Sequence, residues 1–327
     1  MNRDPSLENR LITVFGGSGF IGRYVVGRLS KRGYRLRVAV RHPNRAPYLK
    51  PMGEVGQIDV VAADITNPAS VEAALEGAWG CVNLVGILYE TRRRTFNAIH
   101  HQAAASLAVC ASRRGVRHFV HLSAIGADAE SRSSYGRSKA RGEQAVRESC
   151  PETVVVRPSV VFGPEDDFFN RFAAMALLAP GLPLIGGGHT RFQPVYVGDV
   201  AQAVCAAFED EAAPGRIYEL GGPEIYSFRS LMEMLLRMIG RRRMLVPVPF
   251  AVARLMGSFL QWLPSPPLTA DQVALLEYDN IVSKEALAED RTAQGLGITP
   301  TGLEVIVPTY LERFRTGGHF ADRYKKS

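Results

Sequence analysis

The stretch VFGGSGFIG at residues 14–22 decides how the rest of the chain can be interpreted. It completes an apolar run, residues 11–15, that predicts a buried strand, and residues 24–32 after it predict a helix. Gly16, Gly19 and Gly22 follow the spacing found where a strand turns into a helix beneath a pyrophosphate. We assign Gly16 to the turn, Gly19 to the close approach of phosphate and Gly22 to the packing of helix on strand. The stretch predicts a nucleotide-binding site.

The composition narrows the class of protein. The chain has 327 residues, of which 46% are hydrophobic and 22% charged, and its formal net charge is +7; this fits one large α/β unit or two modest domains. Its four cysteines are widely spaced without a CxxC, so we expect no metal site, no disulfide framework and a reducing compartment. Residues 1–10 are polar, and no apolar run is long enough to span a membrane. The net positive charge is not accompanied by a recognisable nucleic-acid-binding module, so no nucleic-acid partner is expected.

A basic stretch after the glycine turn bears on the choice of nucleotide. An NAD-selective site carries an acidic residue near the end of the second strand, here residues 36–40, but Arg41 stands there. From Arg23 to Gly53 there are nine Lys or Arg and no acidic residue. A guanidinium can hold a 2′-phosphate that a carboxylate would repel, although the same run also fits a solvated basic face. We expect NADP(H) in preference to NAD(H).

Strands and helices alternate through the first half of the chain. Strands are predicted at residues 58–65, 81–86, 119–123 and 153–157, and helices at residues 97–114 and 167–178, which predicts an α/β fold with a doubly wound parallel sheet. Asp64 has two interpretations, as acceptor for an adenine amine or as cap of the helix that begins near Pro68. The run at residues 92–94 is read as a solvated charge run or as a phosphate or partner contact. His100 and His101 are expected to be structural.

Three side chains suggest chemistry. Tyr135 and Lys139 are four residues apart, so on a helix they share one face. An ammonium beside a phenol favours the phenolate, as a general acid/base tyrosine requires, and can bind ribose hydroxyls. Ser123 follows the preceding strand and could donate a hydrogen bond to a substrate carbonyl. Together they predict a catalytic set for acid/base chemistry on a substrate carbonyl beside a nicotinamide nucleotide.

These motifs resemble the extended and atypical short-chain dehydrogenases/reductases, the NAD-dependent epimerase/dehydratase group. The matching stretches are residues 16–22, 64–65, 123, 135–139, 157–164 and 195–201. From the motifs and this resemblance together, the candidate nucleotide contacts are Gly16, Ser18, Gly19, Phe20, Ile21, Gly22, Arg41, Asp64, Ile65, Val85, Gly86, Tyr135, Lys139 and Pro158.

Three further stretches carry a closer resemblance. NLVGILYE at residues 83–90, FGPEDDFFNRF at 162–172 and QPVYVGDV at 193–200 are similar to the nucleotide-binding accessory subunits of respiratory complex I and their bacterial relatives. The resemblance implies a tightly held NADPH, structural in that branch, and a place beside a membrane quinone oxidoreductase. The presence of Tyr135 and Lys139 therefore does not decide whether the chain is an enzyme.

The second half is expected to build a smaller domain. We predict an NADP(H)-binding Rossmann domain over residues 1–219 and a small, interleaved C-terminal α/β domain over residues 220–327, with an apolar segment at 244–263. Within residues 250–263, a narrow polar stripe recurs at helical spacing and leaves a wide apolar surface; the stripe is Arg254, Gly257, Ser258 and Gln261. The segment is too short to span a bilayer. It could lie in a membrane interface, against a membrane-bound partner or over the core of its own domain.

Two functions from different classes follow. The first is an accessory component of a membrane quinone oxidoreductase, with NADP(H) stabilising the fold, in contact with its subunits or with the membrane surface. Its expected location is peripheral, on the cytoplasmic face of the inner membrane. The second is an active NADPH-dependent reductase or epimerase acting on a small carbonyl, sugar-nucleotide or quinone-pathway substrate through Ser123, Tyr135 and Lys139. The first is favoured.

Overall fold

A computed structural model describes residues 7–264 and 266–315 of the chain. Most of the polar stretch at residues 1–10 lies outside the described residues. The described chain divides into two compact units. The first unit holds the residues up to Pro158, with Gly198–Leu220 and Lys284–Ile298; the second holds Ser159–Val197, Gly221–Ser283 and the residues from Thr299 onward. The domain boundary expected at residues 219–220 stays a prediction.

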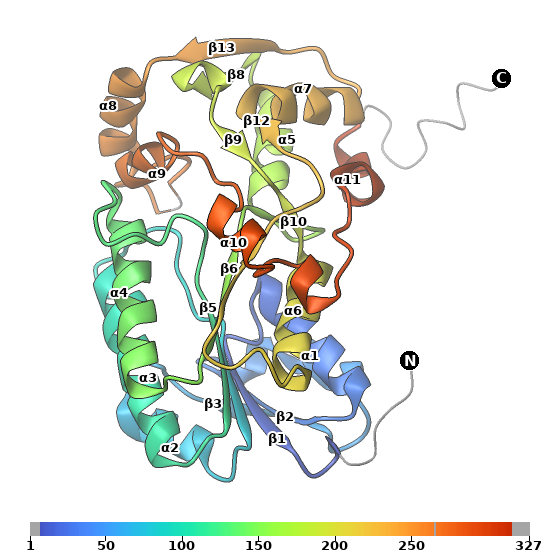
Figure 1. Ribbon diagram of the computed structural model, residues 1–327. Helices are drawn as coiled ribbons and strands as arrows, with labels where there is room; N and C mark the ends of the chain where they lie inside the picture. Colours follow the sequence, from blue (N-terminus) through green and yellow to red (C-terminus); the bar gives the residue numbers. More distant parts are fainter. Residues whose placement is uncertain (1–6, 265, 316–327) are drawn as a thin grey trace, which may run out of the picture. The chain divides into compact units, whose positions relative to one another are not determined.

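The first unit is built on a seven-stranded sheet in the order β11-β6-β5-β4-β1-β2-β3, with every neighbouring pair parallel. Its strands are β1 (Leu11–Phe15), β2 (Arg35–Val40), β3 (Ile58–Ala62), β4 (Gly80–Asn83), β5 (His118–Leu122), β6 (Val154–Pro158) and β11 (Ile217–Leu220). Helices α1 (Phe20–Arg32) and α6 (Val197–Glu209) cover one face, and α2 (Pro68–Leu75), α3 (Ala103–Arg113) and α4 (Ser134–Ser149) cover the other (Figure 1). The short helix α10 (Lys284–Ala288) also belongs to this unit. The predicted doubly wound parallel sheet is confirmed.

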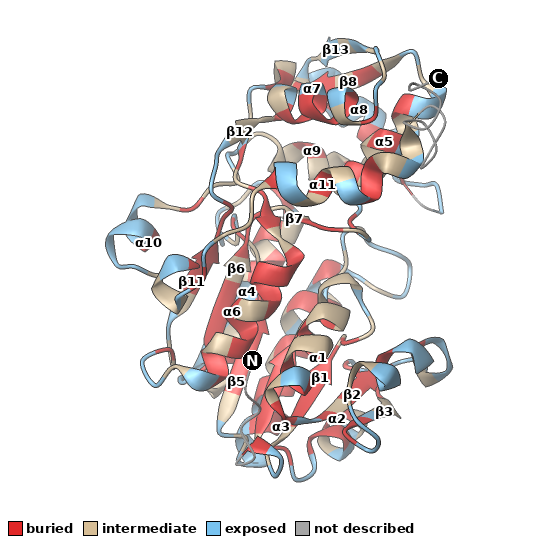
Figure 2. Cartoon of the chain, turned by 90° about the vertical axis from the view of Figure 1, so that its right-hand side faces the viewer, coloured by how far each residue is buried: buried red, intermediate tan, exposed pale blue. Residues whose placement is uncertain are grey.

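Apolar residues of adjacent strands fill the space beneath the helices. Phe15, Cys81 and Phe119 face the small residues of α3, and the central strands are buried along their length (Figure 2). Because α3 presents alanines there, it can pack closely on the sheet. The alanines of α3 are accordingly buried against the sheet.

Two predicted elements need correction. The fourth strand was expected to run to Gly86, but β4 ends at Asn83, whose Oδ1 accepts the N–H of Val85 (3.1 Å) and turns the chain out of the sheet. The helix expected over residues 97–114 begins as a π-helical turn, Asn97–Gln102, and becomes α3 only at Ala103. Such a wide turn inside a helix is rare and often marks a functional site.

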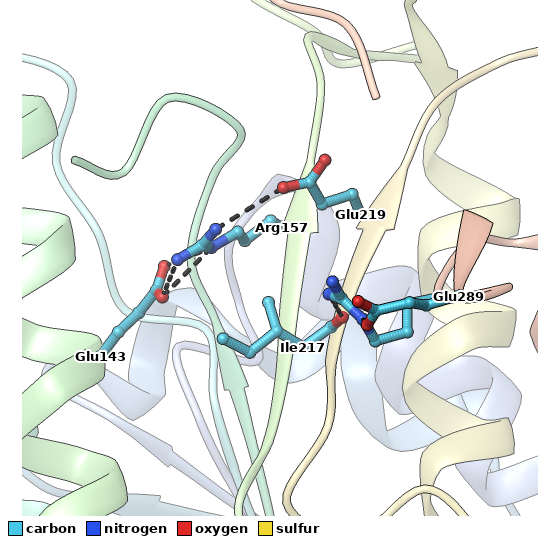
Figure 3. Close-up of polar contacts among 6 residues, drawn as sticks. Glu143, Arg157, Ile217, Glu219 and Glu289 are labelled. Carbon is cyan, nitrogen blue, oxygen red and sulfur yellow. Dashed lines mark hydrogen bonds and ion pairs between the residues drawn. The ribbon is translucent and has the colours of Figure 1, made fainter. Parts of the chain in front are cut away.

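An ion-pair network anchors the sheet edge formed by β6 and β11. Arg157 on β6 binds Glu143 of α4 (Nη2–Oε2 2.6 Å) and lies 3.5 Å from Glu219 of β11, as Figure 3 shows. The carbonyl of Ile217 accepts a further hydrogen bond from Arg291 (2.8 Å). Burial alone would lower the pKa of Arg157, but its two carboxylate partners raise it. Arg157 therefore stays charged and ties α4 to the sheet.

The second unit has its own core. Its strands pair as β7 (Val161–Phe162) with β10 (Val195–Tyr196), β8 (Gly181–Ile185) with β13 (Met244–Val248), and β9 (Arg191–Phe192) with β12 (Tyr226–Ser227). Its helices are α5 (Phe168–Leu178), α7 (Phe228–Met238), α8 (Phe250–Leu260), α9 (Ala270–Leu275) and α11 (Leu303–Leu311). Phe169, Leu182, Leu235 and Val307 bring α5, β8, α7 and α11 into one buried cluster. Short 3-10 turns complete the two units. In the first unit they are Pro43–Arg45, Pro47–Met52 and Gln294–Leu296, and in the second Gly186–Gly188 and Glu312–Phe314.

Helix α8 differs from the predicted stripe at one position. Gly257 does not join the polar surface: it is buried against α9, where an added Cβ would lie 2.6 Å from the amide nitrogen of Ala270. With Ala253 it forms the buried side of α8. The opposite side is exposed, as at Phe259 (72%) and Trp262 (85%, just beyond the helix), so only the side with Ala253 and Phe250 packs on a buried cluster. No helix in the described ranges is long and apolar enough to cross a membrane.

Candidate functional site

The glycine turn lies at the carboxyl end of β1, between β2 and β4. Gly16 has φ +81°, a left-handed conformation that favours glycine, and its carbonyl accepts the N–H of Gly19 (3.0 Å). A Cβ on Gly22 would lie 2.3 Å from the Gly16 oxygen, so α1 can begin this close to the turn only with glycine there. At Gly19 a Cβ would meet only the Gly16 oxygen, at 3.3 Å. The assignments of Gly16 to the turn and Gly22 to close packing agree with this geometry.

The first turn of α1 is arranged to receive an anion. Gly19 is the N-cap, and no side chain caps the helix. The amino end of α1 is flanked by Ser18 and begins with Phe20 and Ile21. Uncapped amides at the positive end of a helix dipole are a favourable place for phosphate oxygens.

A pocket of about 680 Å³ opens beyond the ends of β2 and β3. Arg41, Asp64, Arg93 and Arg94 contribute its charged side chains. The two last arginines are delivered by a tight turn in which Thr91 and Arg94 exchange both backbone hydrogen bonds (2.9 and 3.1 Å). Of the two interpretations of the run at residues 92–94, this placement favours a ligand-facing role for its last two members. The sequence signal for this role of Arg93 and Arg94 is their position in the loop that follows the fourth strand.

The charges in this pocket influence one another. Burial lowers the pKa of Arg94, and the neighbouring Arg41 lowers it further. Burial alone would raise the pKa of Asp64, but hydrogen bonds from Thr66 and the two arginines hold it below its usual value. Two of the three guanidinium groups in the pocket, those of Arg41 and Arg94, therefore repel each other beside one ionised carboxylate, and an added anion would relieve the repulsion.

The capping interpretation of Asp64 is wrong. The N-cap of α2 is Asn67, whose side chain accepts the N–H groups of Ala69 and Ser70. Asp64 Oδ1 instead accepts the N–H and the hydroxyl of Thr66 (3.0 and 2.8 Å). Asn67 immediately precedes α2, whereas Asp64 stands three residues earlier. The sequence interpretation considered Asp64 as the cap and missed the polar residue next to the helix.

Helix α4 brings Tyr135 and Lys139 to the end of β5. The Lys139 side chain is buried, its Nζ donates to the carbonyl of Leu122 (3.1 Å), and the same nitrogen lies 6.0 Å from the centre of the Tyr135 ring. Burial lowers the pKa of Lys139 to about 8, partly opposed by Glu143. The predicted shared face of Tyr135 and Lys139 agrees with this geometry.

Ser123 follows Leu122 directly. Its Oγ is buried and has no hydrogen-bond partner among the described residues. A buried hydroxyl without a partner is costly and is usually satisfied by water or a ligand. The structure thus places the three proposed catalytic residues around one strand end.

The remaining predicted contacts line the same region. The backbone at Leu84 and Val85 lies against the glycine turn, because a Cβ on Gly16 would meet it at 3.1–3.2 Å. A Cβ on Gly86 would lie 3.6 Å from both His100 Nε2 and Lys139 Nζ. Ile65 is buried just beyond β3. The carbonyl of Pro158, at the end of β6, accepts the N–H of Ile125 (3.0 Å) beside Ser123.

Two buried histidines accompany this site. His100 links the loop after β4 to α4, and His121 on β5 lies 3.2 Å from the Asn83 side chain (Nδ1–Nδ2). His121 Nε2 is buried without a partner among the described residues. Burial, with a contribution from Lys139, lowers the pKa of His121 to about 3. Sequence reasoning passed over His121, although a histidine inside an apolar strand two residues before Ser123 was a visible signal.

No group of three or more His, Cys, Asp or Glu in the described part of the chain is placed to hold a metal ion. The site instead offers an uncapped helix end, a basic pocket and buried hydroxyl and amine groups. Groups of these kinds can contact the pyrophosphate, the adenosine end and the nicotinamide ribose of a dinucleotide.

A parallel sheet with a glycine turn after its first strand and this set of side chains defines a dinucleotide-binding Rossmann protein. A model of the NAD dependent epimerase/dehydratase family matches residues 12–221, and the chain belongs to this family. The predicted resemblance is confirmed.

Individual relatives give more detail. The chain is 36% identical over 325 residues to NADH dehydrogenase [ubiquinone] 1 alpha subcomplex subunit 9, mitochondrial, of Arabidopsis thaliana, covering 96% of this chain and 80% of that one. It is 31% identical to the NADH-ubiquinone oxidoreductase 40 kDa subunit, mitochondrial, of Neurospora crassa, covering 96% and 82%. The solved structure of DesIV, a dTDP-glucose 4,6-dehydratase from Streptomyces venezuelae with NAD and TYD bound, superposes with a TM-score of 0.70 at 20% identity, over 93% of this chain and 96% of that one. This last likeness concerns the fold alone.

Proposed function

We propose that this chain is an NADP(H)-binding accessory component of a membrane quinone oxidoreductase of the complex I type, in which the bound nucleotide stabilises the fold. The observation that carries the proposal is the likeness, over nearly the whole chain, to subunits of the mitochondrial enzyme. Peripheral attachment at the cytoplasmic face of the inner membrane is part of the same proposal.

The choice of NADP(H) rests on the basic pocket. Arg41, Arg93 and Arg94 offer three guanidinium groups beyond the end of β2, where an NAD-selective protein would present a carboxylate. A 2′-phosphate placed there would gain charge-assisted hydrogen bonds and relieve the repulsion between Arg41 and Arg94. Asp64 would then be left to contact the adenine or ribose edge.

A structural role for the nucleotide rests on groups that the protein leaves unsatisfied. Ser123 Oγ and His121 Nε2 are buried without partners among the described residues, and Lys139 is desolvated. Ribose hydroxyls and the carboxamide of a bound nucleotide could satisfy such groups. A ligand that binds only the folded chain stabilises it by mass action, so tight binding would raise the free energy of unfolding.

Attachment to the membrane rests on the exposed side of α8 and the residues beyond it. This α8 surface consists of exposed apolar side chains: Val252, Leu255, Met256, Phe259, Trp262 and Leu263. Arg254 lies beside it, half exposed and paired with Glu277 (3.1 Å). Apolar side chains tipped by a tryptophan and bordered by arginine fit the interface of an anionic lipid bilayer. We propose that the α8 surface binds an anionic lipid bilayer. Binding to a subunit of the oxidoreductase is the alternative outcome of the test.

The second candidate function is catalysis by Ser123, Tyr135 and Lys139. The unpartnered Ser123 hydroxyl favours it, because a substrate carbonyl would supply the missing partner. In this reading Tyr135 donates the proton, Lys139 supports the phenolate and Ser123 orients the carbonyl, while the nucleotide supplies the hydride.

Two experiments separate these functions. Membranes of the source cells are solubilised gently, and the chain is followed through fractionation: the accessory proposal expects it to co-migrate with NADH:quinone oxidoreductase activity. A chain found only in the soluble fraction contradicts that proposal. A Tyr135→Phe variant then tests the enzyme reading, which requires loss of a metabolite or quinone conversion while the nucleotide stays bound.

A further inference from the structure

His100 connects the loop after β4 to the helix that carries Tyr135 and Lys139. Its Nε2 accepts the N–H of Ile87 (3.0 Å), and its Nδ1 lies 2.9 Å from the hydroxyl of Ser138 on α4. The Ser138 hydroxyl donates in turn to the carbonyl of Tyr135 (2.8 Å). Each link is buried or half-buried, and all the residues belong to the first unit.

The donors and acceptors of this chain allow one arrangement. Because the Ile87 N–H must donate, Nε2 of His100 carries the lone pair, and the ring proton resides on Nδ1. Because the Ser138 hydroxyl donates to Tyr135, it accepts from Nδ1–H. The hydrogen bonds therefore run in one direction, from Ile87 through a neutral His100 and Ser138 to Tyr135.

Packing holds the imidazole in this orientation. The ring stacks on Phe96 (5.5 Å between centres, 20°) and meets the ring of Tyr135 edge-on (5.2 Å, 85°). At the backbone, a Cβ on Gly142 would lie 1.9 Å from the His100 carbonyl oxygen, so α4 touches the π-helical turn directly. The wide turn at Asn97–Gln102 thus places His100 against both neighbours.

We infer that His100 is a positioning residue that couples the loop at residues 84–87, where a nucleotide would lie, to Tyr135 and Lys139 on α4. The inference rests on the proposed binding of a nucleotide. A Cβ added to Gly86 would lie 3.6 Å from both His100 Nε2 and Lys139 Nζ, so the loop passes close to both side chains, and a ligand that contacts this loop acts on both ends of the coupling. Protonation would break the bond to Ile87 and place a second positive charge beside Lys139, with His121 and Arg94 also nearby, so the coupling requires the neutral ring.

Binding of NADPH to the purified full chain, followed by its fluorescence, tests the coupling. His100→Phe removes both hydrogen bonds of the ring and should weaken binding by at least about tenfold, which is the effect of losing one of them. His100→Gln, which can still accept from Ile87, should recover part of the loss. His101→Phe is the matched control, since His101 lies on the same turn and its side chain bonds, within the described ranges, only to Asn97 (3.1 Å, exposed).

A double-mutant cycle distinguishes positioning from a structural effect. If His100 acts through α4, His100→Phe and Lys139→Met should be non-additive in NADPH affinity; independent, additive losses overturn the inference. Should His100→Phe fail to fold, Ser138→Ala breaks the same chain and is tested in its place. A wild-type chain that binds no NADPH overturns both this inference and the proposed function. A wild-type chain that binds NADPH no better than His100→Phe and Ser138→Ala overturns the inference alone.

Discussion

Lys139 Nζ donates a hydrogen bond to the carbonyl of Leu122 at 3.1 Å, which fixes the buried ammonium beside the end of β5. Because Ser123 follows Leu122, this one contact sets the lysine, the serine hydroxyl and the tyrosine on α4 around a single point. The contact holds the groups in place for a nucleotide whether or not a substrate is ever turned over.

Replacing the arginines of the basic pocket should change nucleotide choice. Arg41→Ala and Arg94→Ala should each weaken NADPH binding by about tenfold or more, since each removes a charge-assisted hydrogen bond to the 2′-phosphate. Binding of NADH, which lacks that phosphate, should change little. Titration with both nucleotides measures the ratio, and Arg92→Ala is the control because Arg92 does not line the pocket. Equal losses for both nucleotides would contradict the proposed 2′-phosphate site.

Alanine at the glycines of the turn should have graded effects. Gly22→Ala forces a Cβ to 2.3 Å from the Gly16 oxygen and should lower the free energy of unfolding by about 1–3 kcal/mol, as overpacking does. Gly27→Ala, on the same helix and with Met52 3.7 Å away as nearest neighbour, should be neutral or stabilising. Urea titrations of both variants provide the measurement. A neutral Gly22→Ala would show that the turn and helix are not packed as described.

The buried histidines should make the nucleotide-free protein sensitive to acid. Burial lowers the pKa of His100 to about 2 and of His121 to about 3, from an ordinary value of 6.5. Below pH 6.5 the unfolded chain therefore binds protons that the folded chain does not, so stability falls as pH falls. Each histidine contributes about 1.4 kcal/mol per pH unit in that window.

His121→Leu should reduce this slope, measured by urea unfolding at several pH values between about 7 and 5. The matched control is His101→Leu on the exposed part of the π-helical turn. A slope that His121→Leu leaves unchanged would mean that His121 is protonated in the folded chain.

Polar substitution on the α8 surface should detach the protein from membranes. Phe259→Ser combined with Trp262→Ser should reduce co-sedimentation with vesicles containing anionic lipid, while the free energy of unfolding stays nearly constant because both side chains are mostly exposed. Val305→Ser is the control, since Val305 is equally exposed but lies on α11. If the Phe259→Ser, Trp262→Ser double variant sediments with vesicles as the unchanged protein does but no longer attaches to the oxidoreductase, the partner is a subunit rather than lipid.

The sequence predicts the fold well because its strongest signals are local. The glycine turn and the alternation of strands and helices each depend on neighbouring residues, and the structure agrees with them. Asp64 was harder, because two acceptors, Asp64 and Asn67, competed for one helix end and only the geometry of the turn decides between them.

Features that join distant segments could not be read from the chain alone. The hydrogen bonds of His100 depend on a π-helical turn that no composition rule indicates, and Gly257 looked polar by spacing but packs on α9. Arg93 and Arg94 resembled a solvated charge run until the exchange of hydrogen bonds between Thr91 and Arg94 placed them beside Arg41. In each case the missing information was the position of a partner far away in sequence.

The central claim is that the glycine turn and the basic pocket hold NADP(H) as part of the folded protein. The most direct measurement is to purify the chain without added nucleotide, denature it, and identify and quantify what is released by chromatography and mass spectrometry. We expect NADPH or NADP⁺ in an amount close to that of the chain. Release of NAD(H), or of no nucleotide together with no binding of added NADPH, would contradict the claim.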